Sequence, residues 1–178
     1  MRRTIIGATP PTKWVPSDSG VPLARVDAAR AHLETAMPAP FDLDRFLTAQ
    51  SPQLADVLDE LKRGRKVSHW MWYFFPQLRG LGLSSTAQFY GIESLDEAAA
   101  FLAHPVLGPR LRECVALMSS HRTRSAEQIL GHVDALKFRS SLTLFARASD
   151  NDAVFVEALD RFYDGQPDPR TLELLDGH

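Results

Sequence analysis

The sequence has a single cysteine, Cys114, among its 178 residues, so no disulfide bond can form within the chain. A chain without disulfides is typical of a reducing compartment. The sequence also has no apolar run near the roughly 20 residues of a membrane-spanning helix. No apolar signal-peptide segment follows Arg2 and Arg3 at the N-terminus. We therefore expect a soluble, cytoplasmic protein that does not contact a membrane.

The short motifs of metal and phosphate sites are missing as well. No two histidines have the spacing of a ligand pair on a helix, and Cys114 stands alone. There is no P-loop, and Gly80-Leu81-Gly82 is too short to indicate phosphate binding. These absences predict that the protein holds no metal ion and no cofactor.

Excess charge of one sign is also missing. The formal net charge is -2, which argues against a protein that binds a nucleic-acid polymer. A local basic patch could still bind one nucleotide.

The N-terminal residues 1–40 differ in composition from the rest of the chain. They hold six of the twelve prolines, which favours extended structure. We expect residues 1–40 to form a proline-rich arm anchored by Trp14, and residues 41–178 to form one helical domain. Such an arm suits packing on the body of the protein or pairing with a second copy of the chain.

From residue 41 onward, capping residues and apolar spacing predict helices. Ser94 with Glu97 fits a capping box, and Gly64 marks a helix end. Asp42 and Ser51-Pro52 are further expected helix starts. No convincing run of strands is present, although Phe74-Phe75 could be briefly extended. The fold expected is all-α, a single multi-helical domain, with helices near residues 42–49, 52–63, 84–90, 95–103, 105–120, 125–131, 134–148, 150–163 and 168–175.

The densest group of aromatic residues lies between His69 and Gly82. It contains two of the three tryptophans, and tryptophan usually needs a hydrogen-bond partner when buried. Such a segment forms either a packed core or a ligand pocket in which rings stack on a flat ligand. For the pocket, the candidate ligand-binding residues of this segment are His69, Trp70, Trp72, Gln77 and Arg79.

A second candidate group is Lys137-x-x-Ser140-Ser141 on one expected helix. Positions three and four apart share a helix face, so the ammonium and the hydroxyl groups could bind one anionic or sugar-bearing ligand. The alternative is that Lys137 pairs with Asp134 and the serines bond back to the backbone. Arg110, near the start of its helix, is a further candidate for binding an anion.

Several spaced blocks of the sequence resemble a known family. They are residues 41–50, the aromatic segment 69–82, Tyr90-Gly91-Ile92, and residues 104–114, 134–145 and 168–175. Together they are similar to an uncharacterised family of small bacterial proteins that often carries the label "calpastatin". The resemblance covers roughly residues 41–175 and implies a multi-helical cytoplasmic fold. The label does not fit, because a calpain inhibitor is a disordered eukaryotic chain.

Two functions from different classes remain open. The first is a pocket for a nucleotide-like or ribosyl ligand, with hydrolysis of an N-glycosidic bond as the first reaction to test. The small bacterial ADP-ribose-processing N-glycosidases also combine an aromatic-plus-histidine block with a later Lys-Phe helix, although their Glu-His pair is missing here. The second is a module that binds a metabolite or a protein partner without catalysis. The sequence names no catalytic residue.

Overall fold

The computed structural model describes residues 41–177, and the expected arm at residues 1–40, with its Trp14 anchor, lies outside them. Within residues 41–177 the chain forms ten helices and no strand, which confirms the all-α prediction. None of these helices has the length and apolar character that crossing a bilayer requires. The helices are α2 (Asp44–Gln50), α3 (Leu54–Arg63), α4 (Met71–Phe74), α5 (Ser85–Phe89), α6 (Leu95–Ala103), α7 (Leu107–Ser120), α8 (Ala126–Leu130), α9 (His132–Ala148), α10 (Ala153–Tyr163) and α11 (Pro169–Asp176).

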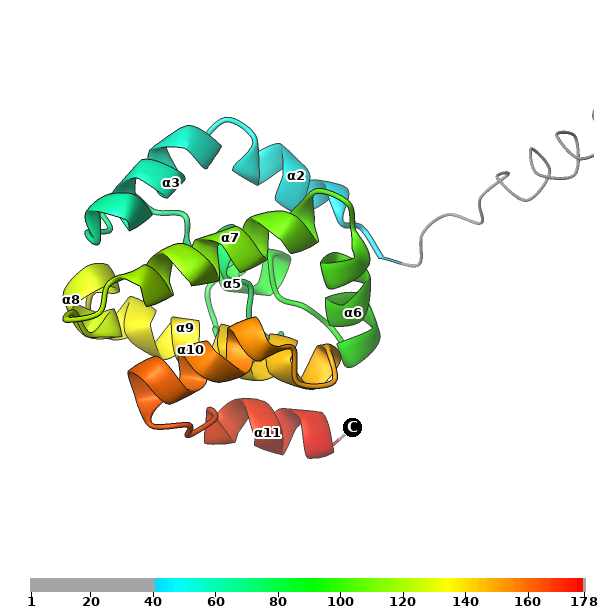
Figure 1. Cartoon of the computed structure of the whole chain (residues 1–178). Helices are drawn as coiled ribbons and strands as arrows, with labels where there is room; N and C mark the ends of the chain where they lie inside the picture. Colours follow the sequence, from blue (N-terminus) through cyan, green and yellow to red (C-terminus); the bar gives the residue numbers. More distant parts are fainter. Residues whose placement is uncertain (1–40, 178) are drawn as a thin grey trace, which may run out of the picture. The chain divides into compact units, whose positions relative to one another are not determined.

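The two longest helices, α7 and α9, organise the packing of this helical body (Figure 1). Helix α9 packs against α6, α8, α10 and α11, whereas α7 packs against α3, α4, α6 and α10. Every residue of α9 from Ser140 to Ala146 is buried. A helix that is buried on all sides runs through a core rather than over a surface, so α9 is the central helix of the body.

The apolar spacing of α3 gives the burial that it predicts. Val57 and Leu61 are fully buried, while Leu54 and Leu58 pack against the core from its edge. Gly64 ends the helix in the left-handed conformation, with φ of +66°. A Cβ at Gly64 would also lie 2.8 Å from the ring of His121. Glycine is therefore required at this position by both conformation and space.

Three local predictions are wrong. Asp42 does not cap α2, whose N-cap is Leu43 without a side-chain bond. Ser51 does not open α3, because its hydroxyl donates back to the carbonyl of Leu47 at the end of α2. Phe74 is helical rather than extended, because it closes the short helix α4. For Ser51, the carbonyl of Leu47 competes for the hydroxyl group that the pattern assigns to a cap.

The start of α6 follows half of the expected capping box. Ser94 accepts a hydrogen bond from the backbone N–H of Glu97, as predicted. The carboxylate of Glu97, however, accepts the N–H of Glu93 rather than that of Ser94. Glu97 therefore fixes the chain one residue before the cap, at the point where the preceding loop enters the helix.

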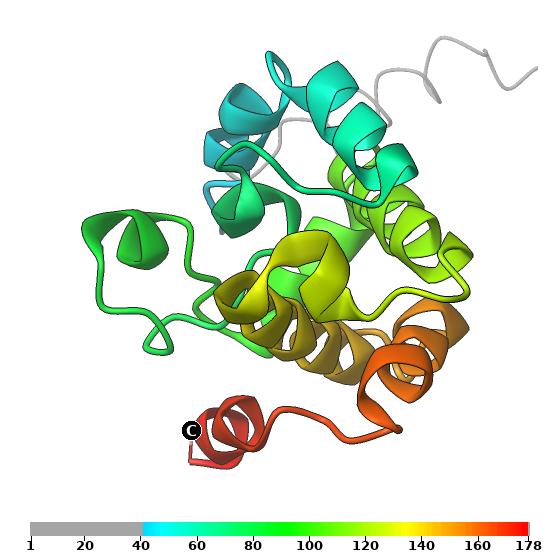
Figure 2. The ribbon, with the colours of Figure 1, turned by 90° about the vertical axis from the view of Figure 1, so that its left-hand side faces the viewer.

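That preceding loop carries α5 and closes on itself at its base. Leu78 and Ile92 form an isolated parallel bridge, with the N–H of Arg79 2.7 Å from the carbonyl of Ile92. The N–H of Ile92 donates in turn to Gln77 at 2.9 Å. The segment between the two strand-like residues projects from the helical body as a lobe (Figure 2). The bridge thus holds residues 78–79 beside the start of α6.

Candidate functional site

The aromatic segment divides into a buried part and a partly exposed part. Trp70 is fully buried and packs edge-on against Phe74. Its indole N–H donates to the Glu60 carboxylate at 2.8 Å, which also accepts the hydroxyl of Ser68. Trp70 therefore belongs to the core, with its polar atom satisfied inside the protein.

Trp72 lies on a different side of the short helix α4 and is only partly buried. The ammonium of Lys137 lies 4.8 Å from the centre of its ring, within range of a cation–π interaction. Trp72 and Gln77 line a cavity of only about 10 Å³, which is room for a water molecule and no more. One face of Trp72 is thus already covered by Lys137.

Lys137 shares its ion-pair partner with a second lysine. Asp134 lies 2.8 Å from the ammonium of Lys137 and 2.8 Å from that of Lys66. Burial alone would raise the pKa of Asp134, but the hydrogen bonds from Lys137 and Lys66 outweigh it and hold the pKa below its usual value. The structure therefore contains the Lys137–Asp134 pair that the sequence left as the alternative to a ligand-binding lysine.

Glu60 is a second carboxylate held ionised beside the aromatic segment. Its burial opposes ionisation, but hydrogen bonds from Ser68, Val67 and Trp70 lower the pKa of Glu60. Both acidic groups next to the tryptophans are thus stabilised as anions by protein donors. Neither is tuned toward the raised pKa of a general acid.

The other candidate residues do not line the cavity beside Trp72. Ser140 is buried, and its hydroxyl donates to the carbonyl of Leu136, while Ser141 is buried beside it in α9. Arg110 donates to the side chain of Gln50 at 3.2 Å. His69 is exposed, and its carbonyl accepts the hydroxyl of Tyr73. Of the nine residues expected to bind a ligand, Trp72 and Gln77 line the cavity of about 10 Å³, and Arg79 lies at a separate groove.

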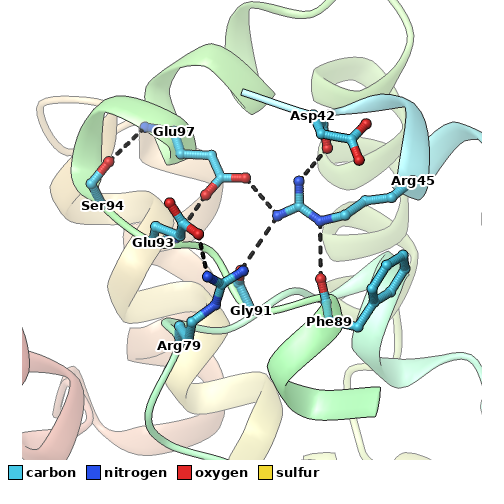
Figure 3. A network of polar contacts seen from close by, with 8 residues as sticks. All are labelled: Asp42, Arg45, Arg79, Phe89, Gly91, Glu93, Ser94 and Glu97. Carbon is cyan, nitrogen blue, oxygen red and sulfur yellow. Dashed lines mark hydrogen bonds and ion pairs between the residues drawn. The ribbon is translucent and has the colours of Figure 1, made fainter. Parts of the chain in front are cut away.

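Arg79 belongs to a polar network at the base of the α5 lobe (Figure 3). Its guanidinium pairs with the carboxylate of Glu93 and reaches the carbonyl of Gly91. The same carbonyl accepts a bond from Arg45, which also pairs with Glu97. Two arginines thus converge on one backbone group and fix the segment that leads into α6.

A groove of about 250 Å³ lies beside this network, between the base of the lobe, the start of α6, and α11. We call it the Arg79 groove. One part of its lining is apolar and leucine-rich, and the other is polar and charged. Its lining residues are Leu78, Arg79, Glu93, Ser94, Leu95, Asp96, Leu174 and Leu175.

Of the residues expected to bind a ligand, only Arg79 lines this groove. The sequence pattern predicts a helix cap at Ser94 and a last helix that contains Leu174 and Leu175. It therefore indicates a structural role for these residues and no role in binding. Nothing in the local spacing of residues indicates that the start of α6 and the last helix of the chain line the same groove. They do so because α6 and α11 both pack on α9.

Comparison with known proteins supports the fold. The model of a family described as "Protein of unknown function (DUF1810)" matches residues 40–175. The chain is similar to the conserved hypothetical protein Rv1873 from Mycobacterium tuberculosis, known from a crystal structure. The identity is 54%, the match covers 78% of this chain and 99% of that chain, and the TM-score is 0.76. The comparison with curated proteins gives no match. These findings confirm the resemblance to an uncharacterised family.

Proposed function

This chain belongs to the DUF1810 family of proteins of unknown function, and from the geometry of the Arg79 groove we propose that it binds a small ribose-bearing molecule of nucleoside size. The proposal keeps the ribosyl class of ligand that the sequence suggested. It moves the site away from the tryptophans, because Trp70 is buried, Lys137 covers one face of Trp72, and the cavity beside Trp72 holds only about 10 Å³.

The observation that carries the proposal is the two-sided lining of the groove. Leu78, Leu174 and Leu175 offer an apolar surface to a flat base, and Asp96 offers carboxylate oxygens to ribose hydroxyl groups. A carboxylate that accepts hydrogen bonds from a ribose hydroxyl is a recurrent way of holding this sugar. The groove volume of about 250 Å³ lies just below the usual range of ligand pockets, so it suits a nucleoside better than a dinucleotide.

The charge of the lining favours a nucleoside over a nucleotide. Arg79 contributes one positive charge, and Glu93 and Asp96 contribute two negative charges, which leaves a net charge of -1. Arg79 is also engaged by Glu93. A phosphate group would therefore meet like charge rather than a free guanidinium.

The arrangement favours binding without catalysis. Glycosidic hydrolysis by the usual route uses two carboxyl groups, one as acid and one as base or nucleophile. Glu93 is paired with Arg79 and Glu97 is paired with Arg45. Within residues 41–177, Asp96 is the one groove carboxylate without an ion pair. We therefore propose a binding module, and we place it in the cytoplasm because of its lone cysteine.

Isothermal titration with adenosine, 2′-deoxyadenosine and AMP tests the proposal. We expect the binding that depends on Asp96 to be tighter for adenosine than for 2′-deoxyadenosine, which lacks a hydroxyl group, and tighter than for AMP, which adds negative charge. Asp96→Asn keeps the shape of the side chain and should weaken adenosine binding about tenfold, as for the loss of a hydrogen bond to a charged group. Asp56→Asn, on the exposed face of α3, removes the same charge far from the groove and should change nothing.

Two results would contradict the proposal. One is no saturable binding of adenosine by the wild-type protein, and the other is equal binding by wild type and Asp96→Asn. Chromatography of the titrated mixture tests catalysis separately. Free adenine that accumulates only in the presence of folded protein would show that the protein is an N-glycosidic hydrolase and not a binding module.

A further inference from the structure

A second hollow, of about 310 Å³, lies where α3 ends and the segment before α8 passes over it. Its lining residues are Glu60, Arg63, Arg65, Val67 and Arg124. We call it the arginine hollow. Figure 1 shows α3 and α8 on one side of the helical body and α6 on the other. The hollow is therefore distinct from the Arg79 groove.

Backbone contacts fix two of the segments that form the arginine hollow. The guanidinium of Arg124 donates to the carbonyl of Gly64 at 2.8 Å. The ring of His121 bonds to the carbonyl of Leu61 at 2.7 Å. These contacts also satisfy carbonyl groups at the C-terminal end of α3, the helix end that would otherwise repel an anion. Arg124 and the turn at Gly64 are thus held together before any ligand binds.

The net charge of the arginine hollow is positive. Three guanidinium groups face one carboxylate, which leaves a net charge of +2 for the lining residues. The carboxylate, Glu60, already accepts hydrogen bonds from Val67, Ser68 and Trp70. Asp59 lies outside the lining and pairs with Arg63, so counting it leaves +1.

Although Arg63 forms an ion pair with Asp59, its guanidinium group can still bind a ligand. Its side chain is 74% exposed and that of Asp59 is 53% exposed. Exposed pairs of this kind contribute little and exchange readily. Arg65 is exposed and forms no ion pair among the described residues. Two guanidinium groups are therefore available beside a third that is already fixed.

We propose that the arginine hollow binds the phosphoryl group of a small phosphate monoester. Guanidinium groups present planar pairs of N–H donors that match the oxygen atoms of a phosphate, and charge-assisted hydrogen bonds of this kind are roughly twice as strong as neutral ones. The volume of about 310 Å³ leaves room for an organic group attached to the phosphate. This site is independent of the proposed nucleoside site, because its charge has the opposite sign and its lining residues are different.

The test is a titration of the full chain with inorganic phosphate and with phenyl phosphate at constant ionic strength. The NMR chemical shifts of the backbone amides report the binding. We expect saturable shifts at Arg63, Arg65 and Arg124, with the tighter binding for phenyl phosphate. Arg65→Gln should weaken the binding about tenfold. Its melting temperature should stay that of the wild type, because Arg65 is exposed.

Arg170→Gln is the matched control, because Arg170 is an exposed arginine on α11 with only a 3.9 Å contact to Glu173. Its titration should match that of the wild type. The proposal is overturned by shifts that do not saturate, by shifts located elsewhere, or by equal weakening in Arg65→Gln and Arg170→Gln. The last result would mean that only the net charge of the protein matters.

Discussion

The Nη2 atom of Arg45 lies 2.6 Å from the Oε1 atom of Glu97, although 52 residues separate them in the sequence. Both side chains are almost fully buried. Arg45 also donates to the carbonyl groups of Phe89 and Gly91, and Glu97 accepts the N–H of Glu93. The pair therefore ties α2 and α6 to the end of the α5 lobe, and in doing so it positions one wall of the Arg79 groove.

Removing one partner of this pair should strongly destabilise the protein. Arg45→Met leaves the Glu97 carboxylate buried without its partner, so we expect unfolding free energy to fall by about 3 kcal/mol or more. Arg79→Met is the control, because Arg79 and Glu93 are both exposed and their pair should be worth no more than about 1 kcal/mol. Urea unfolding of the three proteins checks this. Equal losses in the two variants would show that the Arg45–Glu97 pair has no special role.

The two tryptophans should respond differently to truncation. Trp70→Ala removes a fully buried ring and leaves Glu60 without one donor, so the loss should be on the order of 3–5 kcal/mol. Trp72→Ala removes a partly exposed ring and should cost less. Chemical denaturation measures both. A folded Trp72→Ala protein that has lost adenosine binding would instead support the stacking site that the sequence suggested.

Asp134 should make stability depend on pH in acid. Because the pKa of Asp134 in the folded protein lies below its ordinary value of 3.8, its ion pairs contribute stability above that value. This stability is lost as pH falls through the lowered pKa. The difference in unfolding free energy between wild type and Asp134→Asn should therefore be largest at neutral pH and shrink below about pH 4.

Thermal or urea unfolding of wild type and Asp134→Asn across pH 7 to 3 measures this difference. Asp59→Asn, in an exposed pair, should show almost none of it. If the difference in unfolding free energy between wild type and Asp134→Asn stays constant down to pH 3, Asp134 is not an ionised carboxylate paired with two lysines.

The thiol of Cys114 should be unreactive in the folded protein. Burial raises the pKa of Cys114 to about 12, so almost no thiolate exists at pH 8. A coloured disulfide reagent should modify it only after denaturant is added, at the rate of unfolding. Rapid modification of the native protein would show that the α7 core opens far more readily than its packing indicates.

Local signals in the sequence located most of the helices. Ser94, Ser125 and Asp168 cap α6, α8 and α11, and Gly64 ends α3. Each of these signals is complete within four residues, so the sequence alone contains it. The cap pattern was wrong at Ser51, because the carbonyl of Leu47 offers its hydroxyl a nearer partner. It was also wrong at Asp42, because Leu43 is the residue that precedes α2.

The candidate site was much harder to predict, because it depends on which distant segments meet. The sequence pattern of the aromatic segment is the same whether its rings face a ligand or the core. The packing of the chain around α4 buries Trp70 and leaves Trp72 near the surface. The Arg79 groove needs the start of α6, α11 and the base of the lobe to lie close enough to line one hollow, and α6 and α11 reach that position by packing on α9. The arginine hollow likewise needs Arg124 to meet the end of α3.

The most direct test of nucleoside binding at the Arg79 groove is to titrate the protein with adenosine and to measure the NMR chemical shifts of its backbone amides. We expect saturable shifts at Arg79, Ser94, Asp96 and Leu174, which are among the residues that line the Arg79 groove. Those shifts should weaken in Asp96→Asn and stay unchanged in Asp56→Asn. Shifts centred on Trp72 and Lys137 would place the ligand at the aromatic segment instead, and the absence of any saturable shift would show that the Arg79 groove does not bind a nucleoside.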